Sequence, residues 1–146
     1  MIGLTFDGII LTAATLLDGG EIFASTEQIA PDTDYRAWLL AVCAMIEQVR
    51  TPQNAGDALG VALPAIIQDD VVAYSAFSLL ANTSIRRDLQ SALGMPVSVH
   101  NIGEALATQA CRTGAATDAQ LAVAMWIGNS CHGGLALAGQ PVTGAH

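Results

Sequence analysis

The first thirty residues alternate between short apolar runs and turn residues. Ile2–Phe6, Ile9–Leu17 and Glu21–Thr26 are rich in apolar and β-branched side chains, which is typical of strands. Asp7-Gly8 predicts a type I′ hairpin turn, whose two central positions both need positive φ. Asp18-Gly19-Gly20 predicts the next turn. We therefore expect a three-stranded antiparallel meander.

A helical period follows the meander. Pro31-Asp32-Thr33-Asp34 opens the helix and Thr51-Pro52 ends it. Its apolar face contains Trp38, Leu39, Val42, Met45, Ile46 and Val49. Ala58–Leu63 is short and does not alternate, as expected for a strand covered on both faces. Residues 65 to 82 are ambiguous, and we expect them to be mostly loop.

The next segment has clear helix stop signals. Ser84 can cap a helix that we expect to run to Leu93, where Gly94 supplies the left-handed end and Pro96 prevents continuation. Val97–Val99 reads as another short strand.

The last third predicts one more helix and a hairpin. Gly103–Arg112 is a helix rich in small residues, and Thr113–Asp118 is a polar link. Leu121–Ile127 and Gly134–Ala138 are strands joined by a Gly-rich turn over residues 128 to 133. The element order is βββαβαβα with a C-terminal β-hairpin, an α/β fold with a mixed sheet. We expect one unit over residues 1–118 and the hairpin extension over 119–146.

The amino-acid composition also predicts an apolar surface that binds a partner. Of 146 residues, 52% are hydrophobic and only 12% charged, against a typical charged share of about 25%. So few charged side chains leave apolar faces uncovered, including Val123, Met125, Trp126 and Ile127 of the hairpin. We expect a homo-oligomer, formed through the apolar hairpin or a sheet face.

The net charge excludes some classes of partner, and the cysteine content favours one cellular compartment. The net charge is −8, and the five basic residues are scattered, which excludes nucleic acid and anionic membranes as partners of this chain. The three cysteines imply no disulfide framework, and the N-terminal residues do not resemble a signal peptide. We expect a cytoplasmic protein.

Four segments, read with the element order, resemble a known family. They are Ile2–Gly8, Gly60–Pro64, Leu93–Asn101 and Ile127–His146. The order resembles the ribonuclease-H-like plan of actin and hexokinases, and the segments resemble landmarks of the ROK family of bacterial sugar kinases and sugar-responsive repressors. The resemblance implies the amino-terminal lobe of a two-lobed sugar kinase, with sugar and nucleotide bound between the lobes.

The resemblance also locates a missing catalytic base. ROK kinases carry a catalytic Asp directly after an Asn, and here Asn101 is followed by Ile102. An isoleucine cannot accept the proton of a sugar hydroxyl. Glu104 is the nearest carboxylate and a weak candidate to replace the base, although its side chain should leave from a different helix face. Asn101 could bind a sugar hydroxyl or cap its own turn.

Both phosphate loops implied by the resemblance depart from the family pattern. In the first loop, the aligned positions read Thr5, Asp7, Gly8 and Ile9, so the opening Asp, one glycine and the Thr are replaced. The second loop retains Gly128, Gly133 and Gly134, while Asn129 replaces the Thr and the bulky Cys131 and His132 intervene. Each loop could bind phosphate through its amides or serve only as a turn.

These departures leave two leading functions. The first is a non-catalytic ROK sugar-kinase-like domain, a pseudokinase with a structural, regulatory or ligand-sensing role. The alternative is the amino-terminal lobe of an ATP-dependent kinase acting on a hexose or N-acetylhexosamine, which would need ATP and Mg²⁺. A ROK repressor fragment ranks last, because no helix-turn-helix precedes Met1. We expect no metal site, since Cys131 and His132 are adjacent and His100 and His146 are distant. No cofactor is expected for the chain alone.

Overall fold

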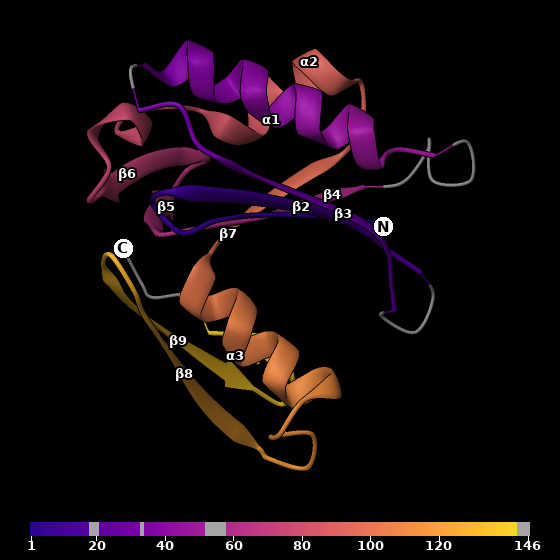
Figure 1. Ribbon diagram of the computed structural model, residues 1–146. Helices are drawn as coiled ribbons and strands as arrows, with labels where there is room; N and C mark the ends of the chain where they lie inside the picture. The colour runs from indigo at the N-terminus through magenta and orange to yellow at the C-terminus, as the bar shows by residue number, and fades with distance from the viewer. Residues whose placement is uncertain (18–20, 33, 52–57, 143–146) are drawn as a thin grey trace.

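The computed structural model describes residues 1–17, 21–32, 34–51 and 58–142 (Figure 1). The helices are α1 Tyr35–Val49, α2 Ile85–Leu93 and α3 Ile102–Thr113, with a 3₁₀ turn at Ser78–Leu80. The strands are β1 Ile2–Phe6, β2 Ile10–Leu16, β3 Ile22–Ile29, β4 Leu59–Leu63, β5 Ala65–Gln68, β6 Val71–Ser75, β7 Val97–Asn101, β8 Leu121–Ile127, β9 Cys131–Leu137 and β10 Gln140–Pro141.

A five-stranded mixed sheet has the order β3-β2-β1-β4-β7. The first three strands form the predicted antiparallel meander, and β1, β4 and β7 run parallel. The register places Gly3 beside Gly60 and Thr5 beside Ala62, so small side chains meet on one face of the sheet. The predicted mixed sheet is confirmed.

Helices α1 and α2 cover the other face of this sheet (Figure 1). Asp34 caps α1 by accepting the amide of Ala37 at 2.8 Å, which explains why the helix begins there. Trp38 and Met45 are fully buried against Leu4 and Phe6 of β1, in the same core. The predicted apolar face of α1 is confirmed, with Leu39 partly buried at its edge.

Helix α3 and the β8–β9–β10 sheet lie on the opposite side of the five-stranded sheet (Figure 1). Their buried core consists of four small residues, Ala107, Cys111, Ala122 and Ala136. Helix α3 packs chiefly on β8 and β9 rather than on the first sheet. The boundary near residue 118 remains a prediction, and α3, which precedes it, packs with the hairpin that follows it.

The expected loop over residues 65 to 82 is wrong, because this segment contains β5 and β6. These strands form a hairpin in which Gln68 pairs with Val71. Asp69 and Asp70 between them have φ of 49° and 65°, the geometry of a type I′ turn made without glycine. Aspartate tolerates the left-handed region, so two aspartates adopt the positive φ angles that glycine usually supplies in such a turn.

The type I′ turn expected at Asp7-Gly8 is also wrong in detail. A hairpin turn is present between β1 and β2, but only Gly8 has positive φ, at 107°. The Gly-rich turn expected over residues 128 to 133 is shorter than predicted, because β9 already begins at Cys131. The turn predicted at residues 18 to 20 lies outside the described residues.

Within the described ranges, no helix is both long and apolar enough to cross a bilayer.

Candidate functional site

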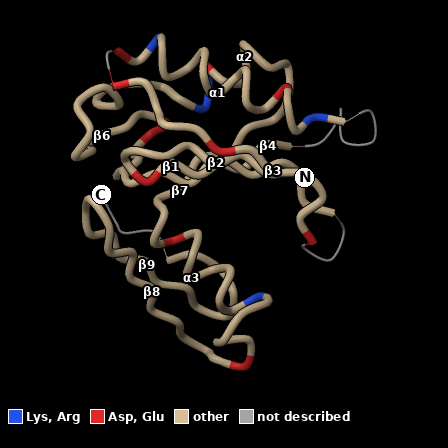
Figure 2. The backbone as a smooth tube through the Cα atoms, viewed as in Figure 1, with Lys and Arg blue, Asp and Glu red and all other residues tan. Residues whose placement is uncertain are grey.

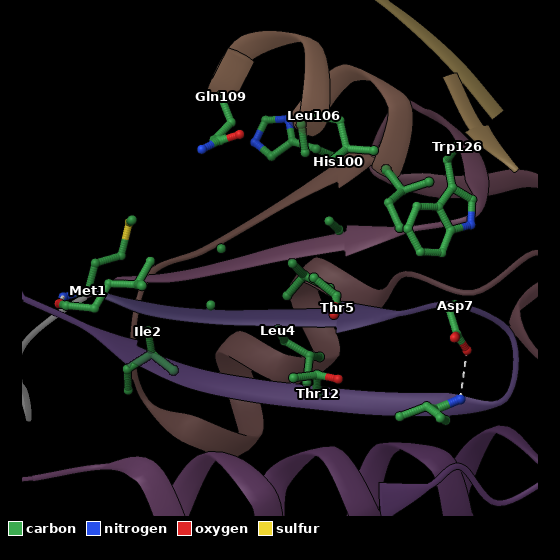
Figure 3. Close-up of a pocket in the computed structure, with 18 residues that line it drawn as sticks. Met1, Ile2, Leu4, Thr5, Asp7, Thr12, His100, Leu106, Gln109 and Trp126 are labelled. Atoms are coloured by element: carbon green, nitrogen blue, oxygen red, sulfur yellow. Dashed lines mark hydrogen bonds between the residues drawn. The ribbon is translucent and has the colours of Figure 1, made fainter. Parts of the chain in front are cut away.

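An apolar groove of about 520 Å³ lies between α3 and the face of the five-stranded sheet that α1 and α2 leave uncovered. Its floor includes Gly3 and Gly60, and Leu106 of α3 and Trp126 of β8 line its other side. Figure 3 shows it running along β1, with Met1 at one end and Asp7 at the other. The groove therefore lies between the five-stranded sheet on one side and α3 with Trp126 of β8 on the other.

Ile102 occupies the first turn of α3, at the position that the family resemblance assigns to the catalytic base. Its side chain is only 4% exposed and lines the groove. Among the described residues that line this groove, Asp7 is the one carboxylate. A hydrocarbon side chain therefore lines the groove at the position that the resemblance assigns to the base.

Asp7 is already bonded within its own turn. Its Oδ1 accepts the amide of Ile9 at 2.8 Å and the amide of Ile10 at 2.7 Å. The second of these bonds is visible in Figure 3. The amides of a phosphate loop must point at the incoming anion. Here a carboxylate of the protein occupies two of them.

Phe77 covers the same turn from the segment that follows β6. A Cβ atom added to Gly8 would lie 1.9 Å from Cζ of Phe77, so the ring sits directly over this glycine. The Phe77 ring also packs edge-on against Phe6, with centroids 5.4 Å apart. Sequence reasoning missed Phe77, because nothing local links it to a turn almost seventy residues earlier.

Asn101 lies at the junction between β7 and α3, and both the oxygen and the nitrogen of its side chain form hydrogen bonds. Oδ1 accepts the amide of Gly103 at 2.7 Å, which caps the helix, and Nδ2 donates to the carbonyl of Ala65 at 2.8 Å. Nδ2 also lies 3.5 Å from Nδ1 of His132. The capping role considered for Asn101 is present, and its role in sugar binding remains a prediction.

His132 extends this contact into the second loop. Its Nε2 lies 2.9 Å from the hydroxyl of Ser130. Burial lowers the pKa of His132, which favours the neutral ring. A neutral ring suits these contacts, because Nδ1 then accepts from Asn101 while Nε2–H donates to Ser130.

Two glycines of the second loop contact α3 through their backbone. A Cβ added to Gly134 would lie 2.1 Å from the carbonyl carbon of Gly103, and one added to Gly103 would lie 2.4 Å from the carbonyl carbon of Gly133. Close helix–strand approach is thus a structural reason for Gly134 and for Gly103. Gly128 and Asn129 lie exposed at the hairpin tip. The phosphate-binding role of these loop residues remains a prediction.

Glu104 lies apart from Ile102. It lines a second hollow together with Arg112 and Gln140, and it is absent from the lining of the groove that contains Ile102. His100 lines both spaces. In the part of the chain that the structure describes, no group of three or more His, Cys, Asp or Glu side chains is placed to hold a metal ion.

The comparisons with known proteins agree with this architecture. The model of the ROK family matches residues 2–146. This chain belongs to the ROK family. The N-acetyl-D-glucosamine kinase of Salmonella typhimurium is 26% identical over 132 residues, covering 84% of this chain and 44% of the relative. The chain thus spans less than half the length of that curated relative.

Solved structures of the family share the fold. A Streptomyces griseus glucokinase, in complex with glucose and AMPPNP, superposes with a TM-score of 0.89 at 19% identity, over 99% of this chain and 46% of that one. A polyphosphate/ATP-glucomannokinase from an Arthrobacter strain gives 0.87 at 24% identity, over 99% of this chain and 61% of that one. The ribonuclease-H-like fold predicted for this ROK chain is therefore confirmed.

The first turn does not fit the triphosphate of ATP, the cofactor that the kinase reading requires. The Asp7 carboxylate would repel phosphate oxygens at the amides it occupies, and the ring of Phe77 blocks approach to Gly8. Asp7 accepts both bonds through Oδ1, and no second carboxylate among the described groove-lining residues faces it to share an Mg²⁺ ion.

Proposed function

We propose that this chain is a non-catalytic ROK sugar-kinase-like domain with a structural, regulatory or ligand-sensing role. The observation that carries the proposal is the buried side chain of Ile102, which faces the groove where a base would act. General-base help is worth about 10²–10⁴-fold in rate, so its loss alone would cripple phosphoryl transfer. The occupied turn at Asp7 supports the same conclusion independently.

A second candidate is the amino-terminal lobe of an ATP-dependent kinase for a hexose or N-acetylhexosamine. Its support is the similarity to N-acetyl-D-glucosamine kinases over 84% of the chain. In this alternative Glu104 would have to supply the base, from the hollow that it shares with Arg112. ATP and Mg²⁺ would be required.

A possible sugar ligand belongs to both candidates. Asn101 is the N-cap of α3, between His100 and Ile102, which both line the groove, and its Oδ1 can accept a further bond because an amide oxygen has two lone pairs. A sugar hydroxyl that bound there would meet Ile102 rather than a carboxylate. Binding without turnover would be the signature of a ligand-sensing domain.

The test joins calorimetry to an ADP-release assay. The chain is titrated with glucose, N-acetylglucosamine and N-acetylmannosamine, each with and without Mg-ATP, and ADP formation is followed. We expect no ADP formation above the protein-free rate with any sugar. Sugar binding in calorimetry would select the ligand-sensing role, and its absence the structural or regulatory one.

Two matched variants keep the outcome interpretable. Glu104→Gln removes the weak base candidate, and Glu47→Gln removes a carboxylate on α1, across the sheet from the groove. Sugar-dependent ADP formation by the wild-type chain would refute the proposal. If Glu104→Gln abolished that activity and Glu47→Gln did not, the kinase candidate would replace it, with Glu104 as the base.

We further propose a cytoplasmic location for this domain. All three cysteines, Cys43, Cys111 and Cys131, are free thiols, and Cys131 is exposed. An exposed free thiol is compatible with a reducing compartment.

A further inference from the structure

The tip of the β8–β9 hairpin contains an Asn–Ser pair that lies outside both strands. Strand β8 ends at Ile127 and β9 begins at Cys131, so Asn129 and Ser130 belong to neither. A backbone bond of 3.0 Å, from the amide of Gly128 to the carbonyl of Ser130, closes the tip. The side chain of Asn129 is exposed. Water and hydroxide therefore reach this side chain directly.

The reactive groups of this pair are not held by other contacts. Among the described residues, the side chain of Asn129 forms no hydrogen bond and the amide of Ser130 donates none. Serine has no β-branch, so its amide nitrogen is sterically accessible from the preceding side chain. Figure 2 shows β8 and β9 without a charged residue, so no carboxylate of the hairpin opposes the loss of a proton from that amide.

The other asparagines that the structure describes lack these features. Asn82 precedes the β-branched Thr83, whose amide donates to the carbonyl of Leu80 at 3.2 Å. Asn101 precedes the β-branched Ile102, and both polar atoms of its side chain are hydrogen-bonded. In each case the attacking amide or the side-chain amide is held away from reaction. The tip of the hairpin is therefore distinct from both.

We propose that Asn129 is a site of spontaneous deamidation through a cyclic imide. The amide nitrogen of Ser130 loses its proton and forms a bond to Cγ of Asn129. The bond from Cγ to Nδ2 then breaks, and Nδ2 leaves as ammonia, which takes up that proton. Water opens the ring, giving aspartate when it adds at Cγ and isoaspartate when it adds at the backbone carbonyl carbon. The reaction needs no reactant besides water.

Deamidation would place a carboxylate in the loop that the family resemblance assigns to phosphate. It would be the first carboxylate between Leu121 and Leu137. Like the carboxylate of Asp7 in the first turn, it would repel phosphate oxygens. Isoaspartate would also lengthen the backbone by one carbon atom, inside the turn that Gly128 and Ser130 close. The result is a slow covalent change that opposes anion binding at this loop.

The experiment follows the folded chain in mildly alkaline buffer over several weeks by intact mass, peptide mapping and ion exchange. We expect a product that is heavier by about 1 Da and more negatively charged, with the change located at Asn129. An isoaspartyl methyltransferase should label part of this product. Deamidation at Asn129 should be at least about tenfold faster than at Asn82 or Asn101, where local opening must come first. Asn54 lies outside the described residues, and its own peptide is followed separately.

Three variants test the chemical route. Ser130→Thr keeps the hydroxyl that contacts His132 but adds a β-branch beside the attacking nitrogen, and should slow the reaction several-fold. Asn129→Gln keeps an amide whose longer side chain must close a larger ring, and should abolish the early product. Asn82→Gln is the matched control and should leave the product unchanged. Far-ultraviolet circular dichroism checks that each variant folds.

Each remaining outcome overturns the proposal. One is deamidation at Asn82 or Asn101 that is as fast as at Asn129. Another is a folded chain that stays intact at Asn129 while the same chain in urea is modified there. An unchanged rate in Ser130→Thr would exclude ring closure through residue 130. None of these measurements involves nucleotide or sugar, so the proposal does not depend on the proposed function.

Discussion

The two sheets of this chain are held together in different ways. The five-stranded sheet packs against α1 and α2 through large buried side chains, including Trp38, Phe6 and Met45. The three-stranded sheet packs against α3 through four small residues and through backbone contact at Gly103 and Gly134. A large apolar core tolerates repacking, whereas backbone-to-backbone contact leaves no atom free to yield. Stability in the second region therefore depends on glycine rather than on buried volume.

The largest expected effect is at Gly134, and it tests this difference directly. In Gly134→Ala the new methyl group would meet the backbone of Gly103 at 2.1 Å, so α3 and β9 must separate, at a cost of about 3 kcal/mol or more. Hydrogen exchange should speed up in β8, β9 and α3 while β1 and β4 stay protected. The matched control is Gly133→Ala, whose nearest new contact would be 3.9 Å away. Equal loss of protection in both variants would contradict the role of close approach.

A smaller effect is expected at Asn101, which connects the two regions. Asn101→Ala removes the cap of α3 and the bond to the Ala65 carbonyl, and should lower the free energy of unfolding by about 1–2 kcal/mol in urea denaturation. Asn101→Asp retains the acceptor for Gly103 but loses the donor to Ala65. If the junction matters beyond capping, this variant should recover only part of the loss.

The smallest effect is a pH dependence that arises in the second region. Burial lowers the pKa of His132 below its ordinary value of 6.5, so the unfolded chain binds a proton more readily than the folded one. Stability should therefore fall as the pH drops below about 6.5, down to the folded pKa. This contribution is isolated by comparing the thermal midpoints of the wild type and of His132→Gln at about pH 7.5 and at about pH 5, which lie on either side of the ordinary histidine pKa. An identical slope in the two proteins would rule it out.

Much of the first sheet could be predicted because its signals are local. Helix α1 has its cap, its apolar period and its end within one stretch of sequence, and β1 and β7 lie where their apolar runs predict. The β5–β6 hairpin was missed because Asp69 and Asp70 adopt positive φ without glycine. Local sequence rules predict a type I′ turn only where the glycine that usually adopts positive φ is present.

The candidate site was harder to predict because its contacts join distant residues. The sequence indicated that Asn101 precedes a position without a base, and the structure places Ile102 at the groove. The sequence did not indicate that Phe77 covers Gly8, or that His132 contacts Asn101 from 31 positions away. Such pairings depend on how the sheets meet, which no short window of sequence contains.

The carboxylate of Asp7 has a consequence for how this chain should respond to salts. Peptide dipoles that converge on a turn ordinarily attract sulfate or phosphate from solution, and the bound ion then raises the melting temperature. Here the opposing charge belongs to the same chain, two and three residues before the amides of Ile9 and Ile10 that it accepts, so a dissolved anion must compete with an attached one. A variant with an acid after Asn101, such as Ile102→Asp, would still have the carboxylate of Asp7 bonded to these two amides.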